Sequence, residues 1–473
     1  MRRACRAVLP AALGLALIGG GCSEGRRPNV LLVVIDTARA DRFSFDGYGR
    51  PTSPEIEALA AEGAVYERAR TPAPWTLPAH ASLFTGLYPS AHGADSGHLM
   101  LDGSFLTLAE SFHEAGYRTV GYAANPWVGR QYGLDQGFDT YEEMWRTPRA
   151  GSEDAGAAAL NEKLLRFFEW RQGNPTVATQ PFFVFVNYLE AHLPYNPPEP
   201  WRSRFLGRHA DPATVARLRT FKHPDEVRFV LGLGGLEGSD LPILSDLYDG
   251  EIAYVDQKVG EVTGALRRLG LLDGTIVVVT SDHGEAIGDH GFLDHKMNVY
   301  EELLRIPLVV RYPPAIAPGQ RIKVPVMLQD LHPTLLRLAG IDPGNAPQGG
   351  TDADRARLLP GIRGLADARP PSRDFNVSEF ARPIQFLEII QQRFPDAKIV
   401  PWDRSLVSYS DGREKLHWAS DGRHRLYDLT ADPAERNDLA ATRPERVRSL
   451  AALVDAWLRR PGARPPLALP STH

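Results

Sequence analysis

Cysteine is almost absent from this chain of 473 residues, which contains only Cys5 and Cys22. Both lie close to the amino terminus, so the rest of the chain cannot form a disulfide bond. It also offers no thiolate as a nucleophile or a metal ligand. Chemistry that needs a cysteine is therefore excluded for the folded part of the chain.

The sequence also lacks a block of charge of one sign. The formal net charge is −5, and charged residues make up 23% of the chain without clustering. A nucleic-acid partner would require a basic face, so we expect none. The hydrophobic share of 43% is that of an ordinary globular protein.

A hydrophobic run long enough to cross a membrane is missing near the amino terminus. Residues 1–21 instead have the pattern of an export signal: three arginines, an apolar run over residues 8–18 and three glycines before Cys22. Cys22 resembles the lipidated cysteine of a bacterial lipoprotein, although Gly19 stands where such signals usually carry leucine. We expect an exported protein, periplasmic or held at the outer membrane only by this lipid. Ordinary secretion is the alternative.

The length predicts one large domain and a smaller one. Apolar runs at residues 29–35, 118–123, 182–187, 275–280 and 306–311 alternate with helical patterns, notably at 245–269 and 332–339. This alternation predicts a doubly wound α/β domain with a mostly parallel sheet. We place it at residues 28–345, with an irregular insertion at 202–238.

The carboxyl-terminal part has a different pattern. Residues 346–375 are rich in Pro, Gly, Asp and Arg and are interpreted as a linker. Short alternating segments at 406–409, 414–419 and 423–427 precede an amphipathic helix from residue 444 to about 459. We expect a subdomain at 376–460 made of a small antiparallel sheet and a terminal helix, followed by a tail at 461–473.

Charged side chains follow three of the predicted strands. Asp36 and Thr37 follow the first, Glu190 and His192 the third, and Asp282, His283 and Glu285 the fourth. The carboxyl ends of parallel strands meet at one sheet edge, where gathered carboxylates are costly without a cation. The oxygen-rich set of Asp36, Asp282 and His283 predicts a site for one divalent ion, Ca²⁺, Mg²⁺, Mn²⁺ or Zn²⁺. A second site is left open, with Glu190, His192 and His295 available.

Thr76 precedes a predicted helix that carries Pro78 in its first turn. Backbone N–H groups at a helix start favour an anion, and a hydroxyl beside a metal can ionise and attack. Taken alone, a threonine at this place is usually only a helix cap.

The motifs together resemble the sulfatase family of the alkaline phosphatase superfamily. The matching segments are residues 29–36 with Arg39 to Arg42, residues 76–86, residues 281–284, residues 296–307 and the closing residues 427–439. The resemblance implies that Asp36, Asp282 and His283 are metal ligands, with Thr37 in place of the family's second Asp. It implies that Thr76 is the nucleophile and a further ligand, and that His192 and Lys296 contact the ester oxygens.

The chain departs from the family at the catalytic motif. Thr76 stands where the family carries the Cys or Ser that becomes formylglycine, and His80 replaces the Arg that helps to hold it. The family's Lys-x-His pair is replaced by Ala124-Asn125-Pro126. A threonine sulfate ester has no aldehyde route for release, whereas a threonine phosphate ester can be cleaved by a second displacement at phosphorus.

These departures favour a hydrolase or transferase of phosphate mono- or diesters that works through a covalent Thr76 intermediate. A sulfuric ester hydrolase without formylglycine is the first alternative, and a non-catalytic, metal-dependent binder of anionic glycans is the second. The expected substrate is an anionic ester, either a small molecule or a group linked to a glycan or lipid.

Overall fold

The computed structural model describes residues 27–146, 154–208, 210–222, 224–343, 357–363 and 375–464. The export signal, Cys22, most of the predicted linker and the end of the tail lie outside these residues. No helix in the described ranges is long and apolar enough to cross a membrane.

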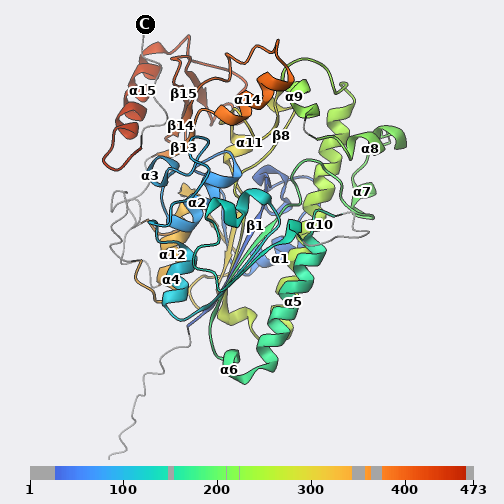
Figure 1. The fold of residues 1–473 in the computed structure, drawn as a ribbon, viewed down its shortest axis with the longest axis vertical. Coiled ribbons are helices and arrows are strands. Elements are labelled where there is room, and N and C mark those ends of the chain that lie inside the picture. The colour runs from blue at the N-terminus through green and yellow to red at the C-terminus, as the bar shows by residue number, and fades with distance from the viewer. Residues whose placement is uncertain are drawn as a thin grey trace, which may run out of the picture.

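An eight-stranded sheet forms the centre of the molecule, as the sequence predicts (Figure 1). Its strand order is β11-β2-β10-β7-β1-β6-β4-β5. Only β10 runs antiparallel to its neighbours β2 and β7, and the other pairings are parallel. In chain order the strands are β1 (Asn29–Ile35), β2 (Ala64–Tyr66), β4 (Arg118–Ala123), β5 (Thr140–Glu143), β6 (Phe182–Tyr188), β7 (Thr275–Thr280), β10 (Leu308–Arg311) and β11 (Gln320–Ile322).

Both faces of this sheet are covered, because successive side chains of the central strands point to opposite faces. Leu31, Val33 and Ile35 of β1 join the core beneath α1, α5 and α10, while Val30, Leu32 and Val34 join the core beneath α2, α4 and α12. These two groups of helices lie on opposite sides of the sheet in Figure 1. Their bounds are α1 (Pro54–Ala61), α2 (Thr76–Thr85), α4 (Leu108–Glu114), α5 (Ala157–Gly173), α10 (Asp240–Arg268) and α12 (Leu331–Leu338).

The segment 202–238 is more regular than the sequence indicated. It carries the short helices α8 (Pro212–Leu218) and α9 (Asp225–Val230), after α7 (Trp201–Arg204), and α10 begins five residues before the predicted start. Asp211 caps α8 by accepting hydrogen bonds from the N–H groups of Ala213 and Thr214. An Asp before a Pro at the helix start is a local capping signal that the sequence-based prediction did not use.

The carboxyl-terminal part is a four-stranded antiparallel sheet with a terminal helix, as predicted. It shares a small core with Tyr88 and Met327 of the larger part. In Figure 1 it lies above the large sheet. Its elements are β13 (Asn376–Phe380), α14 (Ile384–Arg393), β14 (Leu406–Ser410), β15 (Glu414–Ala419), β16 (Arg425–Asp428) and α15 (Pro444–Leu458).

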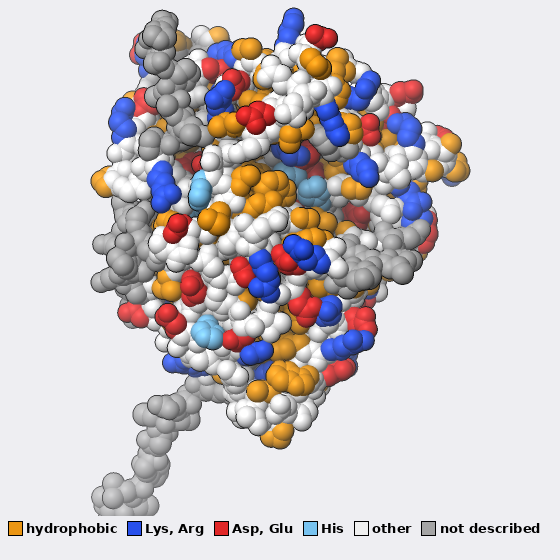
Figure 2. Space-filling model, in the orientation of Figure 1, with side chains coloured by type: hydrophobic (Ala, Val, Ile, Leu, Met, Phe, Trp, Pro, Cys, Tyr) orange, Lys and Arg blue, Asp and Glu red, His pale blue; other side chains and the backbone are white. Residues whose placement is uncertain are grey.

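Shorter elements complete the fold: β3 (Ala69–Arg70), α3 (Pro89–His92), α6 (Pro175–Ala178), β8 (Ala286–Ile287), β9 (Leu293–Asp294), α11 (Glu301–Leu304) and β12 (Val326–Met327). On the face drawn in Figure 2, acidic and basic side chains are interspersed rather than segregated.

Candidate metal and catalytic site

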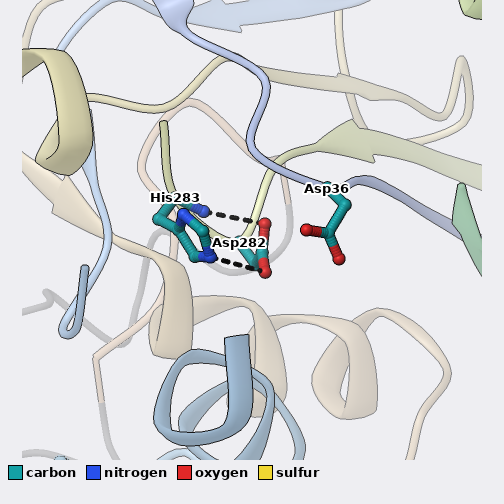
Figure 3. Close-up of side chains that lie close together, drawn as sticks. All are labelled: Asp36, Asp282 and His283. Carbon is teal, nitrogen blue, oxygen red and sulfur yellow. Dashed lines mark hydrogen bonds and ion pairs between the residues drawn. The ribbon is translucent and has the colours of Figure 1, made fainter. Parts of the chain in front are cut away.

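Asp36, Asp282 and His283 meet at the carboxyl end of the sheet (Figure 3). Asp36 follows β1, and Asp282 and His283 follow the adjacent strand β7, whose parallel register with β1 extends to Val34 opposite Thr280. One ligand atom from each residue lies within 4.8 Å of the others, and all three side chains are completely buried. The strand topology alone therefore brings these residues together, as the sequence predicted.

The free lone pairs of this group suit a cation. Oδ1 of Asp36 and Oδ2 of Asp282 are buried and have no hydrogen-bond partner among the described residues. Burial raises the pKa of Asp36, and the charge of Asp282 adds to that shift. Burial also raises the pKa of Asp282, but the interactions with His283 and His80 lower it by more, so the pKa of Asp282 is below its ordinary value. A divalent cation would stabilise both carboxylates in their charged form.

His283 presents the nitrogen that a metal requires. Its Nδ1 lies 2.9 Å from the carbonyl oxygen of Gly284, which can only accept, so Nδ1 carries the proton. Nε2 of the neutral ring then keeps its lone pair and lies 3.2 Å from Oδ2 of Asp282. Gly284 is required here because a Cβ would lie 1.9 Å from the carbonyl oxygen of Glu302. The described residues thus form a group that could bind a divalent ion.

Thr76 is the first residue of α2, whereas the sequence predicted that the helix begins just after Thr76. The side chain is 1% exposed, and Oγ1 lies 3.4 Å from Nε2 of His283. Pro78 is the third residue of the helix, in the first turn, where its lack of a backbone N–H costs no hydrogen bond within the helix. The hydroxyl therefore lies beside the metal-competent group and at the positive end of a helix dipole.

Two asparagines complete the surroundings of Asp36, and the sequence reading gave them no role. Nδ2 of Asn125 donates to Oδ2 of Asp36 at 2.8 Å and to Oγ1 of Thr76 at 3.4 Å. Nδ2 of Asn187 donates to the same Asp36 oxygen at 3.1 Å. Asn187 lies near the end of β6, which pairs with β1, and Asn125 follows β4, which pairs with β6. Their place at the ends of parallel strands could have identified them.

Thr37 connects three segments around the site. Its N–H donates to Oδ1 of Asp282 at 3.1 Å, and its Oγ1 donates to the carbonyl of Ala191 at 2.6 Å. Its own carbonyl accepts from the hydroxyl of Tyr248. Thr37 and Ala191 have positive φ values of 55° and 82°, a strained conformation for residues other than glycine. Thr37 therefore holds the carboxylate of Asp282 in place, and its role as a metal ligand stays a prediction.

His80 lies one turn along α2 from Thr76. Its Nδ1 is 3.0 Å from the carbonyl oxygen of Thr76 and 3.6 Å from Oδ2 of Asp282. The ring is fully buried, and Nε2 has no partner among the described residues. His80 therefore contacts the peptide that carries the hydroxyl.

His192 and Lys296 reach this region through a chain of imidazoles and carboxylates. The half-buried ring of His192 lies 5.1 Å from the ring of His295, which lies 4.4 Å from that of His283. Lys296 forms an ion pair with Oδ2 of Asp294, whose Oδ1 lies 2.7 Å from Nδ1 of His295. Lys296 thus joins the site through Asp294 and His295.

Glu285, Asp294 and His295 form a second buried group with three ligand atoms within 4.8 Å of one another. Nδ1 of His295 also lies 3.2 Å from Oε1 of Glu285. Burial opposes the charge on His295, but the two carboxylates outweigh it and raise the pKa of this imidazole to about 10. Glu190, also considered for a second ion, accepts from the N–H of Ala157 at the start of α5.

A doubly wound sheet with a carboxylate–imidazole group and a buried hydroxyl at a helix start defines a class of ester hydrolases. A family model described as "Sulfatase" matches residues 28–341, and the chain therefore belongs to the sulfatase family of the alkaline phosphatase superfamily. It is a hydrolase of sulfuric or phosphoric esters.

Two curated relatives illustrate the family. The chain is 28% identical over 376 residues to an uncharacterized sulfatase, YidJ, of Escherichia coli, a match covering 73% of this chain and 72% of the relative. It is 24% identical to the choline-sulfatase of Rhizobium meliloti, over 88% of this chain and 82% of the relative.

Among solved structures, a phosphonate monoester hydrolase of Agrobacterium radiobacter is similar with a TM-score of 0.68 and 25% identity. That match covers 91% of this chain and 95% of the other. A 2-O GAG sulfatase has the same TM-score at 19% identity, which shows the shared fold.

Proposed function

We propose that this enzyme hydrolyses or transfers phosphate mono- or diesters through a phosphoryl group carried on Thr76. The observation that carries the proposal is the position of Oγ1 of Thr76, buried and 3.4 Å from both Nε2 of His283 and Nδ2 of Asn125. No cysteine is available outside the amino-terminal region, so formylglycine from cysteine is excluded. The similarity to a phosphonate monoester hydrolase supports chemistry at phosphorus.

Asp36, Asp282 and His283 are the residues we assign to hold a divalent ion, with Thr76 as a further ligand and Thr37 at their edge. Such an ion would lower the pKa of a neighbouring hydroxyl and offset charge on phosphate oxygens. Asn125 and Asn187 both donate to Oδ2 of Asp36. Oδ1 has no partner among the described residues and is the oxygen we assign to the ion. We predict one bound ion, and a second site stays open.

The reaction is written in two displacements. In the first, Oγ1 of Thr76 bonds to phosphorus, its proton passes to solvent, and the ester alcohol leaves with the electron pair of the broken P–O bond. In the second, water attacks phosphorus and the Thr76 oxygen leaves and regains a proton. We assign His192, in its imidazolium form with Nδ1 donating to the carbonyl of Leu193, to protonate the leaving alcohol through Nε2. In the second displacement Nε2 takes a proton from the attacking water, which restores the imidazolium.

We assign supporting roles in these steps to Lys296 and His80. Lys296, held by Asp294 beside His295, is the group we assign to stabilise the charge that non-bridging oxygens gain in the transition state. His80 donates to the carbonyl of Thr76 and thereby orients the first turn of α2.

A sulfuric ester hydrolase that uses Thr76 directly is the second candidate, favoured by the choline-sulfatase relative. Nitrophenyl phosphate, bis(nitrophenyl) phosphate, phenylphosphonate ester and nitrophenyl sulfate, each assayed with Ca²⁺, Mg²⁺, Mn²⁺ and Zn²⁺, distinguish the two. Turnover of a phosphate ester that is lost in Thr76→Ala and kept in Thr76→Ser supports the proposal. Sulfate release without phosphate-ester turnover contradicts it.

We also propose that the enzyme is exported and anchored through a lipid on Cys22. Replacing Cys22 with Ser should move the protein from the membrane fraction to the soluble fraction. Unchanged fractionation would favour ordinary secretion.

A further inference from the structure

The carboxyl-terminal subdomain contacts the segment that carries His295 and Lys296. Residues 295–300 connect β9 to α11 and belong to no helix or strand. Asp294 and Met297, on either side of these two residues, have positive φ values of 68° and 70°. A backbone of this kind is strained for residues other than glycine and persists only where neighbouring groups hold it. The segment therefore requires support from other parts of the chain.

One support is Glu435, which lies in the closing segment 427–439. Its Oε2 accepts a hydrogen bond from the backbone N–H of Glu301 at 2.7 Å. Its Oε1 lies 3.0 Å from Nζ of Lys415 and 2.8 Å from Nε2 of His417. Burial raises the pKa of Glu435, but Lys415 and His417 lower it by more, so the carboxylate is ionised at neutral pH. A buried, charged acceptor with three partners thus holds the start of α11 in one place.

Side chains of the small sheet also contact Tyr300 and Glu301 directly. Nζ of Lys415 lies 2.9 Å from Oε1 of Glu301. The phenol oxygen of Tyr300 accepts a hydrogen bond from Arg425 and lies 3.4 Å from the hydroxyl of Tyr427. Strands β15 and β16 therefore hold the last residue of the connecting segment and the first residue of α11.

A second support contacts Lys296 itself. Its Nζ lies 5.2 Å from the centre of the Phe386 ring on α14, within the distance of a cation–π interaction. Residues of α9 and α14, which lie side by side in Figure 1, line a small pocket together with Lys296 and Met297. The carboxyl-terminal subdomain thus contacts the segment at Lys296 and again at its far end.

We propose that the carboxyl-terminal subdomain positions Lys296 for the reaction, through Glu435 at one end of the segment and Phe386 at the other. Both are positioning residues, because they act through Lys296. Without the carboxylate of Glu435 the start of α11 is released, and the strained backbone at Met297 relaxes and moves Lys296. The inference rests on the role proposed for Lys296, but it is the same whether the enzyme attacks phosphorus or sulfur.

The test is a double-mutant cycle in kcat between Glu435→Ala and Lys296→Ala, with the nitrophenyl ester that the parent enzyme turns over fastest. We expect Glu435→Ala to lower kcat roughly tenfold and to change KM less than about twofold. In the Lys296→Ala background the same substitution should change kcat less than about twofold, because the group through which it acts is absent. Effects that multiply independently overturn the proposal, and so does an unchanged kcat in Lys296→Ala.

A matched control separates positioning from lost stability. Val454→Ala removes a completely buried side chain from the core of the same subdomain, on α15. It should lower the urea midpoint of unfolding, as Glu435→Ala does, and leave kcat within about twofold. A loss of kcat in Val454→Ala as large as that in Glu435→Ala assigns the subdomain to folding alone and overturns the proposal.

A second variant and a separate measurement keep the outcome clear. If Glu435→Ala does not fold, Phe386→Ala, at a half-buried position, replaces it in the cycle with the same expected pattern. Labelling of Thr76 in the parent enzyme during turnover reports on the proposed function by itself. A failure of that function is therefore distinguishable from a failure of the positioning by Glu435.

Discussion

Two buried groups of carboxylates and imidazoles lie side by side in this enzyme and differ in how their charges are balanced. Asp36 and Asp282 face His283, whose Nδ1 donates to a backbone carbonyl, and each aspartate keeps a buried oxygen without a hydrogen-bond partner among the described residues. Glu285 also keeps a buried oxygen, Oε2, without a partner in the described part of the chain, but Glu285 and Asp294 share His295, whose pKa they raise to about 10, and Asp294 also pairs with Lys296. The second group contains two negative and two positive charges.

The difference shows why similar residue types need not make similar sites. The first group requires a cation, whereas the second already contains two. We therefore expect the ion to occupy the Asp36 group and the Glu285 group to position Lys296 and His295. The following variants test that contrast, beginning with the largest expected effect.

Asp282→Ala should abolish metal binding and reduce kcat/KM by about 10³-fold or more, because it removes one of the three residues assigned to hold the ion. Metal content by elemental analysis and steady-state kinetics measure both effects. Asp294→Ala is the matched control in the other group and should keep one ion per chain. Loss of the ion in Asp294→Ala alone would reverse the assignment.

Asp294→Asn should lower kcat by roughly 10- to 100-fold while metal content stays unchanged, since an outer carboxylate orients groups that contact substrate. The variant removes the charge that holds both Lys296 and His295. A changed pH profile of kcat would show that these two cations act in the reaction. A profile identical to that of the parent enzyme would assign Asp294 only to folding.

Asn125→Ala should lower kcat about tenfold, because one amide that holds both Asp36 and Thr76 is lost. Asn187→Ala removes only the bond to Asp36 and should have the smaller effect. An equal loss in both variants would show that the contact with Thr76 contributes nothing.

The free energy of unfolding of the metal-free protein should fall as pH rises from about 6.5 to 10. The folded pKa of His295 is about 10 against an ordinary value of 6.5, so its stabilising effect is complete below pH 6.5 and is lost as pH rises through the folded value. The expected change is on the order of a few kcal/mol. Urea unfolding across this range should show a flatter curve for His295→Gln, and an equal slope would contradict the charge assignment.

The sequence predicted the metal-competent group because strand order alone brings the ends of β1 and β7 together. It predicted the sheet, the carboxyl-terminal strands and the terminal helix for a similar reason, since burial leaves clear periodic patterns. It did not predict the pairing of Asp294 with His295 and Lys296, which depends on loop conformations with positive φ at Asp294 and Met297. Asn125 was interpreted only as the middle residue of the segment that replaces the family's Lys-x-His pair, because its hydrogen bonds depend on where β4 ends relative to β1.

The most direct test of the central claim is whether Thr76 carries phosphate during turnover. The enzyme is mixed with bis(nitrophenyl) phosphate, quenched with acid within the first turnover, and the peptide containing Thr76 is analysed by mass spectrometry. The account predicts a nitrophenyl phosphate group on Thr76, formed as one nitrophenol leaves, that disappears when substrate is exhausted, and none in Thr76→Ala, which is inactive. An unmodified Thr76 during turnover, or full activity of Thr76→Ala, would contradict it.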